Sequence, residues 1–127
     1  MKTLTKLILC IIFLVVVLCF PAYSGSKKVS AASKPKKVEF VDYLLDYDAL
    51  HGQVVQLDGF LLTMGEMYIL YERPGSGNFV FIDVSKLSRN DRKFILTRCG
   101  NGCPMSIVGK PGDVIFNKGL AAIRIAR

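Results

Sequence analysis

Residues 79–108 read FVFIDVSKLSRNDRKFILTRCGNGCPMSIV, and this stretch decides the fold. Its first six residues, 79–84, form a short apolar run that is typical of a strand, and its last four, MSIV, predict another strand. Ser88, followed three residues later by Asp91, resembles a helix capping box in which the shorter acid replaces glutamate. The pattern therefore predicts a helix over residues 88–99 that lies between two strands.

Two further strands are predicted upstream. Residues 55–61 alternate between apolar and other positions, and Gly59 in their middle suggests a bulge or a sharp bend. The turn at residues 64–66 leads into a second strand at 67–72, MYILYE. A loop with two glycines then separates this strand from the one at 79–84.

The two ends of this region carry one more element each. Residues 39–50 place apolar side chains at three-to-four-residue spacing, which predicts a short helix that ends before Gly52. Downstream, residues 111–113 and 117–119 are typical of turns. Residues 121–125 then predict a last strand.

The predicted order is strand, strand, strand, helix, strand, strand. This is the order of an OB-fold, a five-stranded Greek-key barrel with a helix between strands three and four. We therefore expect a mainly β domain over residues 39–127, preceded by the short helix. An SH3-like small barrel is the alternative, but it would not readily explain the helix at 88–99.

Residues 43–125 resemble the small exported bacterial OB-fold proteins. The resemblance is carried by LHGQVVQLDG at 50–59, FVFIDV at 79–84 and VGK at 108–110. It implies an OB domain, but it implies little about the ligand, because these proteins are mostly uncharacterised and OB-folds bind many unrelated ligands. The resemblance does not extend to the two cysteines of this region.

The N-terminus predicts export. Lys2 and Lys6 precede an unbroken apolar run at residues 7–20, and small residues follow it up to Ser24. This is typical of a signal peptide over residues 1–24, with the mature protein periplasmic or secreted. The alternative is a permanent membrane anchor, but a helix of this length covers only about 21 Å of a hydrocarbon core about 30 Å thick.

Residues 25–38 predict a basic, disordered linker, because they lack aromatic residues and are rich in lysine. From residue 39 onward, four lysines and six arginines balance ten acidic residues. The positive charge therefore belongs to the linker, and a nucleic acid is not the favoured partner of the folded domain. The linker is either a solubilising spacer or a contact for acidic envelope polymers or lipids. Its lysines are Lys27, Lys28, Lys34, Lys36 and Lys37.

Cys99 and Cys103 predict a disulfide that links the end of the helix to the next strand. An even pair in an exported chain most simply pairs, and the glycines between the two cysteines permit a tight reversal. A redox-active pair or a metal site are the alternatives. Neither is favoured, because Cys99 lies at a helix C-terminus and His51 is the only histidine. No metal or other cofactor is predicted.

The first three strands of the barrel are the expected ligand-binding surface, since OB-folds stack ligands on aromatic residues there. Both faces of these strands are apolar. One face fills the barrel, and the other needs cover from residues 39–50, from a ligand or from a partner. The sequence does not show which face points inward. The candidate ligand-binding residues are Phe60, Met67, Tyr68, Phe79 and Phe81, together with Arg92 on the capped helix.

These observations predict an exported, non-enzymatic OB-fold binding module for an oligomer, a small molecule or a protein partner, for instance one of the envelope. One alternative is a hydrolase or nuclease-like enzyme that uses Asp58, Asp83 and an arginine. Another is a structural or stress-related envelope protein that is tethered by its lysine-rich segment. No catalytic residue is predicted, because Asp83 is better placed to start the turn into the helix.

Overall fold

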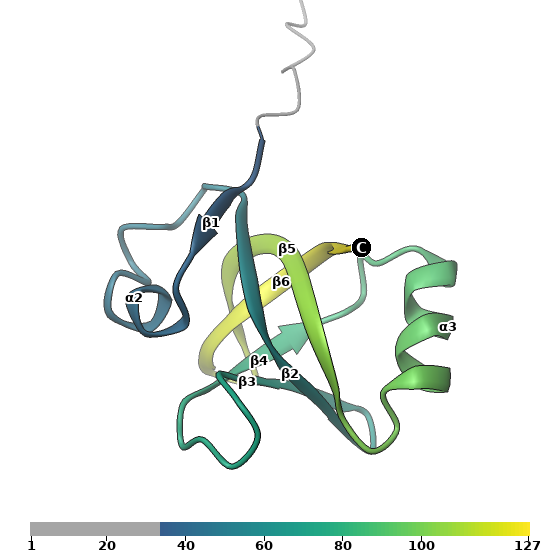
Figure 1. The fold of residues 1–127 in the computed structure, drawn as a ribbon. Helices are drawn as coiled ribbons and strands as arrows, with labels where there is room; N and C mark the ends of the chain where they lie inside the picture. Colours follow the sequence, from purple (N-terminus) through teal and green to yellow (C-terminus); the bar gives the residue numbers. More distant parts are fainter. Residues whose placement is uncertain (1–33) are drawn as a thin grey trace, which may run out of the picture. The chain divides into compact units, whose positions relative to one another are not determined.

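The computed structural model describes residues 34–127, so the predicted signal peptide and residues 25–33 of the predicted linker lie outside the described part (Figure 1). Across residues 34–127, no helix is both long and apolar enough to cross a membrane. The elements are β1 (Lys36–Val38), α2 (Phe40–Leu45), β2 (Val55–Met64), β3 (Met67–Tyr71), β4 (Phe79–Asp83), α3 (Arg89–Arg98), β5 (Cys103–Val114) and β6 (Asn117–Ala126).

Strands β2 to β6 form a closed, mixed barrel. The strand order is β2-β3-β4-β6-β5, and pairing between β2 and β5 closes the ring. Neighbouring strands are antiparallel except β4 and β6, which are parallel. Closure leaves each of the five strands with a neighbour on both sides over part of its length, which limits exposed edges. The architecture is mainly β and consistent with an OB-like barrel.

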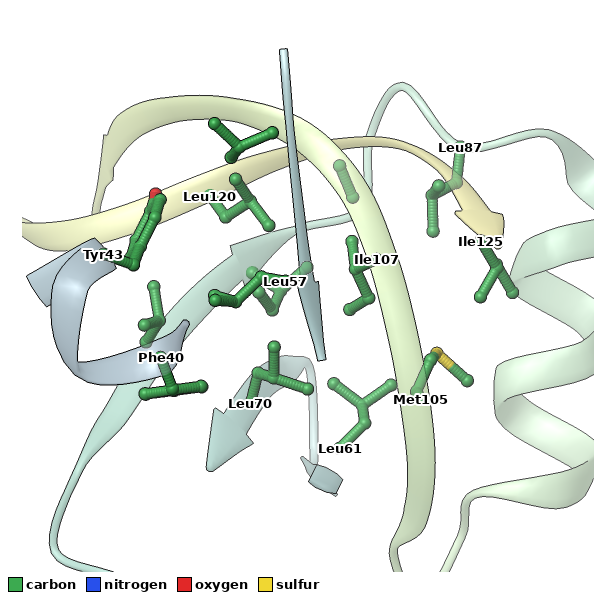
Figure 2. Packing of buried hydrophobic residues seen from close by; sticks show 14 of the residues in the cluster. Phe40, Tyr43, Leu57, Leu61, Leu70, Leu87, Met105, Ile107, Leu120 and Ile125 are labelled. Carbon is green, nitrogen blue, oxygen red and sulfur yellow. The ribbon is translucent and has the colours of Figure 1, made fainter. Parts of the chain in front are cut away.

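The register of the strands defines the inner face of the barrel. Leu61 lies opposite Leu70, and Leu70 lies opposite Val80, so these three side chains point to the same side. All three are fully buried. Figure 2 shows Leu57, Leu61 and Leu70 directed into one core, which Phe40 and Tyr43 of α2 enter from the side.

The first helix is shorter than predicted but buries the predicted residues. The sequence predicts a helix over 39–50, whereas α2 ends at Leu45. The chain then continues in turns, with the Leu50 N–H donating to the carbonyl of Asp46 at 3.0 Å. Tyr47 and Leu50 therefore stay in the core. The Tyr43 hydroxyl donates to the carbonyl of Gly119 at 2.7 Å, and burial raises the pKa of Tyr43.

Strand β1 corrects the predicted linker. Residues 36–38 are not disordered; they pair in parallel with residues 55–57 of β2. The reason is a free edge, because β3 pairs with β2 only over Phe60–Met64 and leaves the first half of β2 without a neighbour on that side. An unpaired edge readily accepts another strand. A lysine-rich composition could not reveal this, since the pairing uses backbone groups.

The last two strands are longer than predicted. A turn at residues 111–113 is wrong, because β5 continues to Val114 and turns at Ile115 and Phe116. Pairing between β2 and β5 ends at Gly109. Beyond that residue β5 has a free edge on one side, where a proline is tolerated although it has no N–H to donate. Strand β6 accordingly begins at Asn117 rather than at residue 121.

Helix α3 closes the barrel on the side away from α2, as Figures 1 and 2 both show. The Ser88 hydroxyl accepts a hydrogen bond from the Asp91 N–H at 3.1 Å, which confirms the predicted cap. The predicted disulfide is present between Cys99 and Cys103, with Cys99 fully buried. Closing so short a loop stabilises the fold by about 2 kcal/mol in the chain-entropy account.

Candidate functional site

The outward side of β2, β3 and β4 carries only apolar side chains over the paired region. Residues that lie opposite each other in a sheet share a face, so the register that sends Leu61 and Leu70 inward sends their neighbours outward. None of these outward residues belongs to the core cluster of the barrel. The outer face consists of Phe60, Leu62, Met64, Met67, Ile69, Tyr71, Phe79 and Phe81.

Helix α2 does not cover the outer face. Its buried residues, Phe40 and Tyr43, pack into the inner core. The outer face stays open, with Met64 50% exposed, Met67 40% and Phe79 44%. Of the covers that the sequence allows, residues 39–50 are therefore wrong. The loop after α3 covers one part of the face, since Gly102 lies against Phe60.

The rings of the outer face pack against one another. The ring centroids of Tyr71 and Phe79 lie 5.8 Å apart, and those of Phe79 and Phe81 lie 5.6 Å apart at nearly a right angle. Ile69 lies between its cross-strand partners Leu62 and Phe81 and is only 6% exposed. This packing restrains the rings before any ligand binds, which lowers the entropy cost of recognition.

A groove of about 310 Å³ lies beside the outer face, between the β2–β3 hairpin and the β5–β6 hairpin. The second hairpin folds toward Phe81, because Val114 lies against Gly119 and Gly119 is the cross-strand partner of Phe81. Both charged residues of the lining are acidic. The hairpin groove is lined by Glu66, Met67, Tyr68, Phe81, Ile82, Asp83, Val84, Ser85, Val114 and Ile115.

The tip of the β5–β6 hairpin breaks the usual rule for such turns. Ile115 and Phe116 have φ of 51° and 62°, as the two central residues of a type I′ turn require. Asparagine and glycine are the usual residues there, and a β-branched residue in this conformation is strained. Phe116 is also fully exposed, at 103% of its reference area. Strained, exposed apolar residues beside a groove suggest a role in binding.

The structure brings four predicted residues together and separates two. Phe60, Met67, Phe79 and Phe81 share the outer face. Tyr68 does not: it lies opposite Thr63 on the inward side and packs against the core, although it also lines the hairpin groove. Arg92 is exposed on α3 and is not among the residues that line the groove.

Sequence reasoning missed Ile115 and Phe116. The predicted turn at residues 111–113 placed these two residues outside a hairpin tip. The available signal was the pair of turn-forming residues Asn117 and Lys118 directly after an apolar pair. A turn at residues 115–116 could be predicted only with knowledge of the register between β5 and β6.

The two aspartates of the enzyme alternative lie in different surroundings. Asp58 forms an ion pair of 2.8 Å with Lys37 and accepts a hydrogen bond from Ser106. The hydrogen bond from Lys37 lowers the pKa of Asp58, and the same contact raises the pKa of Lys37. Asp83 accepts from the Ser85 N–H at 2.9 Å, which confirms its predicted turn role.

A larger hollow of about 670 Å³ lies between β1, the start of α2 and the loop after β3. Three of its charged residues, Lys37, Asp58 and Glu72, have partners within the chain. Asp58 is paired with Lys37, and Glu72 accepts from Asn78 at 2.9 Å and from Ser76 at 3.2 Å. The hydrogen bond from Asn78 lowers the pKa of Glu72.

Among residues 34–127, no group of three or more histidine, cysteine, aspartate or glutamate side chains is placed to hold a metal ion. The His51 ring packs edge-on against Tyr47, with centroids 4.9 Å apart.

No protein-family model, no curated protein and no solved structure matches this chain. The function is therefore inferred from the geometry of residues 34–127.

Proposed function

We propose that the chain is an exported, non-enzymatic binding module with an OB-like fold, and that a protein partner covers its outer face. The observation that carries the proposal is the apolar outer face of three adjacent strands, on which Met64, Met67 and Phe79 are exposed. Soluble proteins rarely leave a large contiguous apolar patch bare, and such patches mark interaction sites.

The chemistry of the outer face favours a protein over other ligands. No lysine or arginine belongs to the outer face or lines the hairpin groove, whereas nucleic-acid binding needs basic side chains for the phosphates. An oligosaccharide would need hydrogen-bond partners for its hydroxyls, because burying them unpaired costs free energy. Tyr71 supplies the single polar atom among the side chains of the outer face, apart from methionine sulfur. Methionine and phenylalanine instead suit an apolar protein surface.

The enzyme alternative gains no support from the aspartates. Asp58 lines the hollow beside β1, whereas Asp83 lines the hairpin groove, and the two linings share no residue. An acid–base pair needs both carboxyls within reach of one substrate. Each carboxyl instead already holds a neighbouring group of the chain.

The test is a selection of binders from a random dodecapeptide library displayed on phage. The target is the chain expressed with its own N-terminal segment and purified in its oxidised form. Phe79→Ser removes an exposed ring from the outer face, and Leu96→Ser is the matched control, because Leu96 is 63% exposed on α3. We expect Phe79→Ser to weaken the selected peptides at least tenfold and Leu96→Ser to leave them unchanged.

Peptides that bind both variants equally would contradict the proposal, as would a library that yields no binder. A titration with an oligothymidylate 20-mer covers the nucleic-acid alternative. If the oligonucleotide changes the amide chemical shifts of β2 to β4 at physiological salt, the partner is a nucleic acid and not a protein.

A further inference from the structure

We propose that the hairpin groove binds a short segment of the partner in extended conformation, as a strand added beside β3. The segment carries apolar side chains and at least one lysine or arginine. This inference rests on the proposed function, since it specifies how the partner of the outer face is held.

The backbone beside the groove has free edges. Strand β4 pairs with β3 only at Ile69–Tyr71, so Met67 and Tyr68 are paired with β2 alone. On the opposite side of the groove, Ile82 and Asp83 are paired with β6 alone. Across residues 34–127, the two strands thus separate at this point, and the groove occupies the gap between their unpaired edges. An open strand edge is a template for another strand.

The side chains around the gap suit an extended apolar segment. Successive side chains of a strand point to opposite sides. Every second side chain of an added strand would therefore lie on the outer face, beside Met67 and Phe81. Val114 and Ile115 form the opposite wall of the groove. A volume of about 310 Å³ lies at the small end for ligand sites, which fits a few side chains rather than a long peptide.

Charge specifies the segment further. Glu66 and Asp83 lie among the lining residues, and no basic residue accompanies them. A cationic side chain of the partner would meet both carboxylates, whereas an acidic one would be repelled. This excludes a polyanion from the groove and points to a basic residue that flanks the apolar ones.

The hairpin tip supplies a further contact. Ile115 is 54% exposed at the wall of the groove, and Phe116 extends beyond it. A segment in the groove would place its apolar side chains against these two residues and bury them. That burial would offset the strain of the left-handed turn in the bound state.

The experiment uses the selected dodecapeptides, now synthesised with single backbone N-methyl groups. In an added strand, alternate residues direct their N–H groups toward β3, so N-methylation at every second residue should weaken binding at least tenfold. N-methylation at the intervening residues should have little effect. Amide hydrogen exchange should also slow at Met67 or Tyr68 when the peptide binds.

A matched pair of variants tests the charge. Glu66→Gln should weaken a lysine-containing peptide about threefold to tenfold at low salt, whereas Glu39→Gln, an exposed acid outside the groove, should not. Peptides that need Phe79 yet tolerate N-methylation at every position would overturn strand addition and leave the proposed function standing. Loss of the Phe79 dependence would overturn both.

A lipid surface is the remaining competitor for the exposed tip. The test is co-sedimentation of the chain with phosphatidylglycerol vesicles. If the chain binds the vesicles, Phe116→Ser abolishes that binding and no selected peptide binds, the partner is a membrane and the peptide proposal is wrong.

Discussion

The two sides of β2, β3 and β4 are both apolar, but they differ in burial and in composition. The inward side chains, such as Leu61, Leu70 and Val80, are fully buried under α2, α3 and the remaining strands. Of the outward side chains, Ile69 is buried between its neighbours, whereas Met64, Met67 and Phe79 are 40–50% exposed. Apolar character alone therefore does not mark the core; the barrel buries one side and leaves the other for a partner.

The difference has a physical cause in barrel closure. A strand sends alternate side chains to opposite sides, and a closed barrel encloses only one of them. Antiparallel barrels in water usually carry polar residues on the other side. Eight apolar residues there are a departure from that pattern, and such departures tend to occur at functional sites.

Substitution on the two sides should separate stability from binding. Leu70→Ala removes a fully buried side chain and should lower the free energy of unfolding by about 2–5 kcal/mol. Phe79→Ala removes a side chain that is already 44% exposed and should cost roughly 1 kcal/mol or less while abolishing peptide binding. Urea denaturation measures both. Equal losses of stability would show that the outer face is structural.

Substitution at the tip of the β5–β6 hairpin should raise the free energy of unfolding rather than lower it. Replacing Ile115 and Phe116 together by Asn and Gly restores the residues that a type I′ turn prefers. Relief of two strained left-handed residues should raise the free energy of unfolding by about 1 kcal/mol, although the selected peptides should bind more weakly. Thermal unfolding and peptide titration measure the two effects. A variant that is less stable than the parent would show that the tip is packed rather than exposed.

The smallest effect concerns the ion pair that anchors β1. The folded pKa of Asp58 is lowered by Lys37, so the pair contributes its full stability above the unfolded pKa of the carboxyl and loses it as the pH falls through the folded value. Asp58→Asn should lower the free energy of unfolding only slightly near pH 6, because both side chains of the pair are exposed to solvent. The difference from the parent should disappear as the pH falls through the lowered pKa of Asp58. Urea denaturation at several pH values checks this, and a constant difference would contradict it.

Much of the fold could be predicted because its signals are local. Alternation in residues 55–61, the apolar run at 79–84 and the Ser88 cap each depend on neighbouring residues. The disulfide followed from two cysteines separated by a flexible turn. The error at β1 concerns backbone pairing with residues 55–57, which leaves no signal in the linker itself. The error at residues 111–113 concerns the position of a hairpin turn, because Pro111 and Gly112 are typical of turns but here pair with Leu120 and Gly119 of β6.

Only part of the candidate site could be predicted, because the position of a side chain on the inner or outer face depends on strand pairing. An aromatic composition identified Phe60, Met67, Phe79 and Phe81 as candidates, but composition cannot tell an inward residue such as Tyr68 from an outward one. The groove also needs Val114 and Ile115, which reach it through the curl of the second hairpin.

The sequence by itself determined the central parts of β2 to β6, where α3 begins and which cysteines pair, because hydrophobic period, capping and loop length act over a few residues. Only the tertiary structure decided which side of β2 to β4 faces the core, which strand edge stays open and what the hairpin tip flanks. These depend on the register between strands far apart in the chain, and a shift of one residue in that register would exchange the inner face for the outer face.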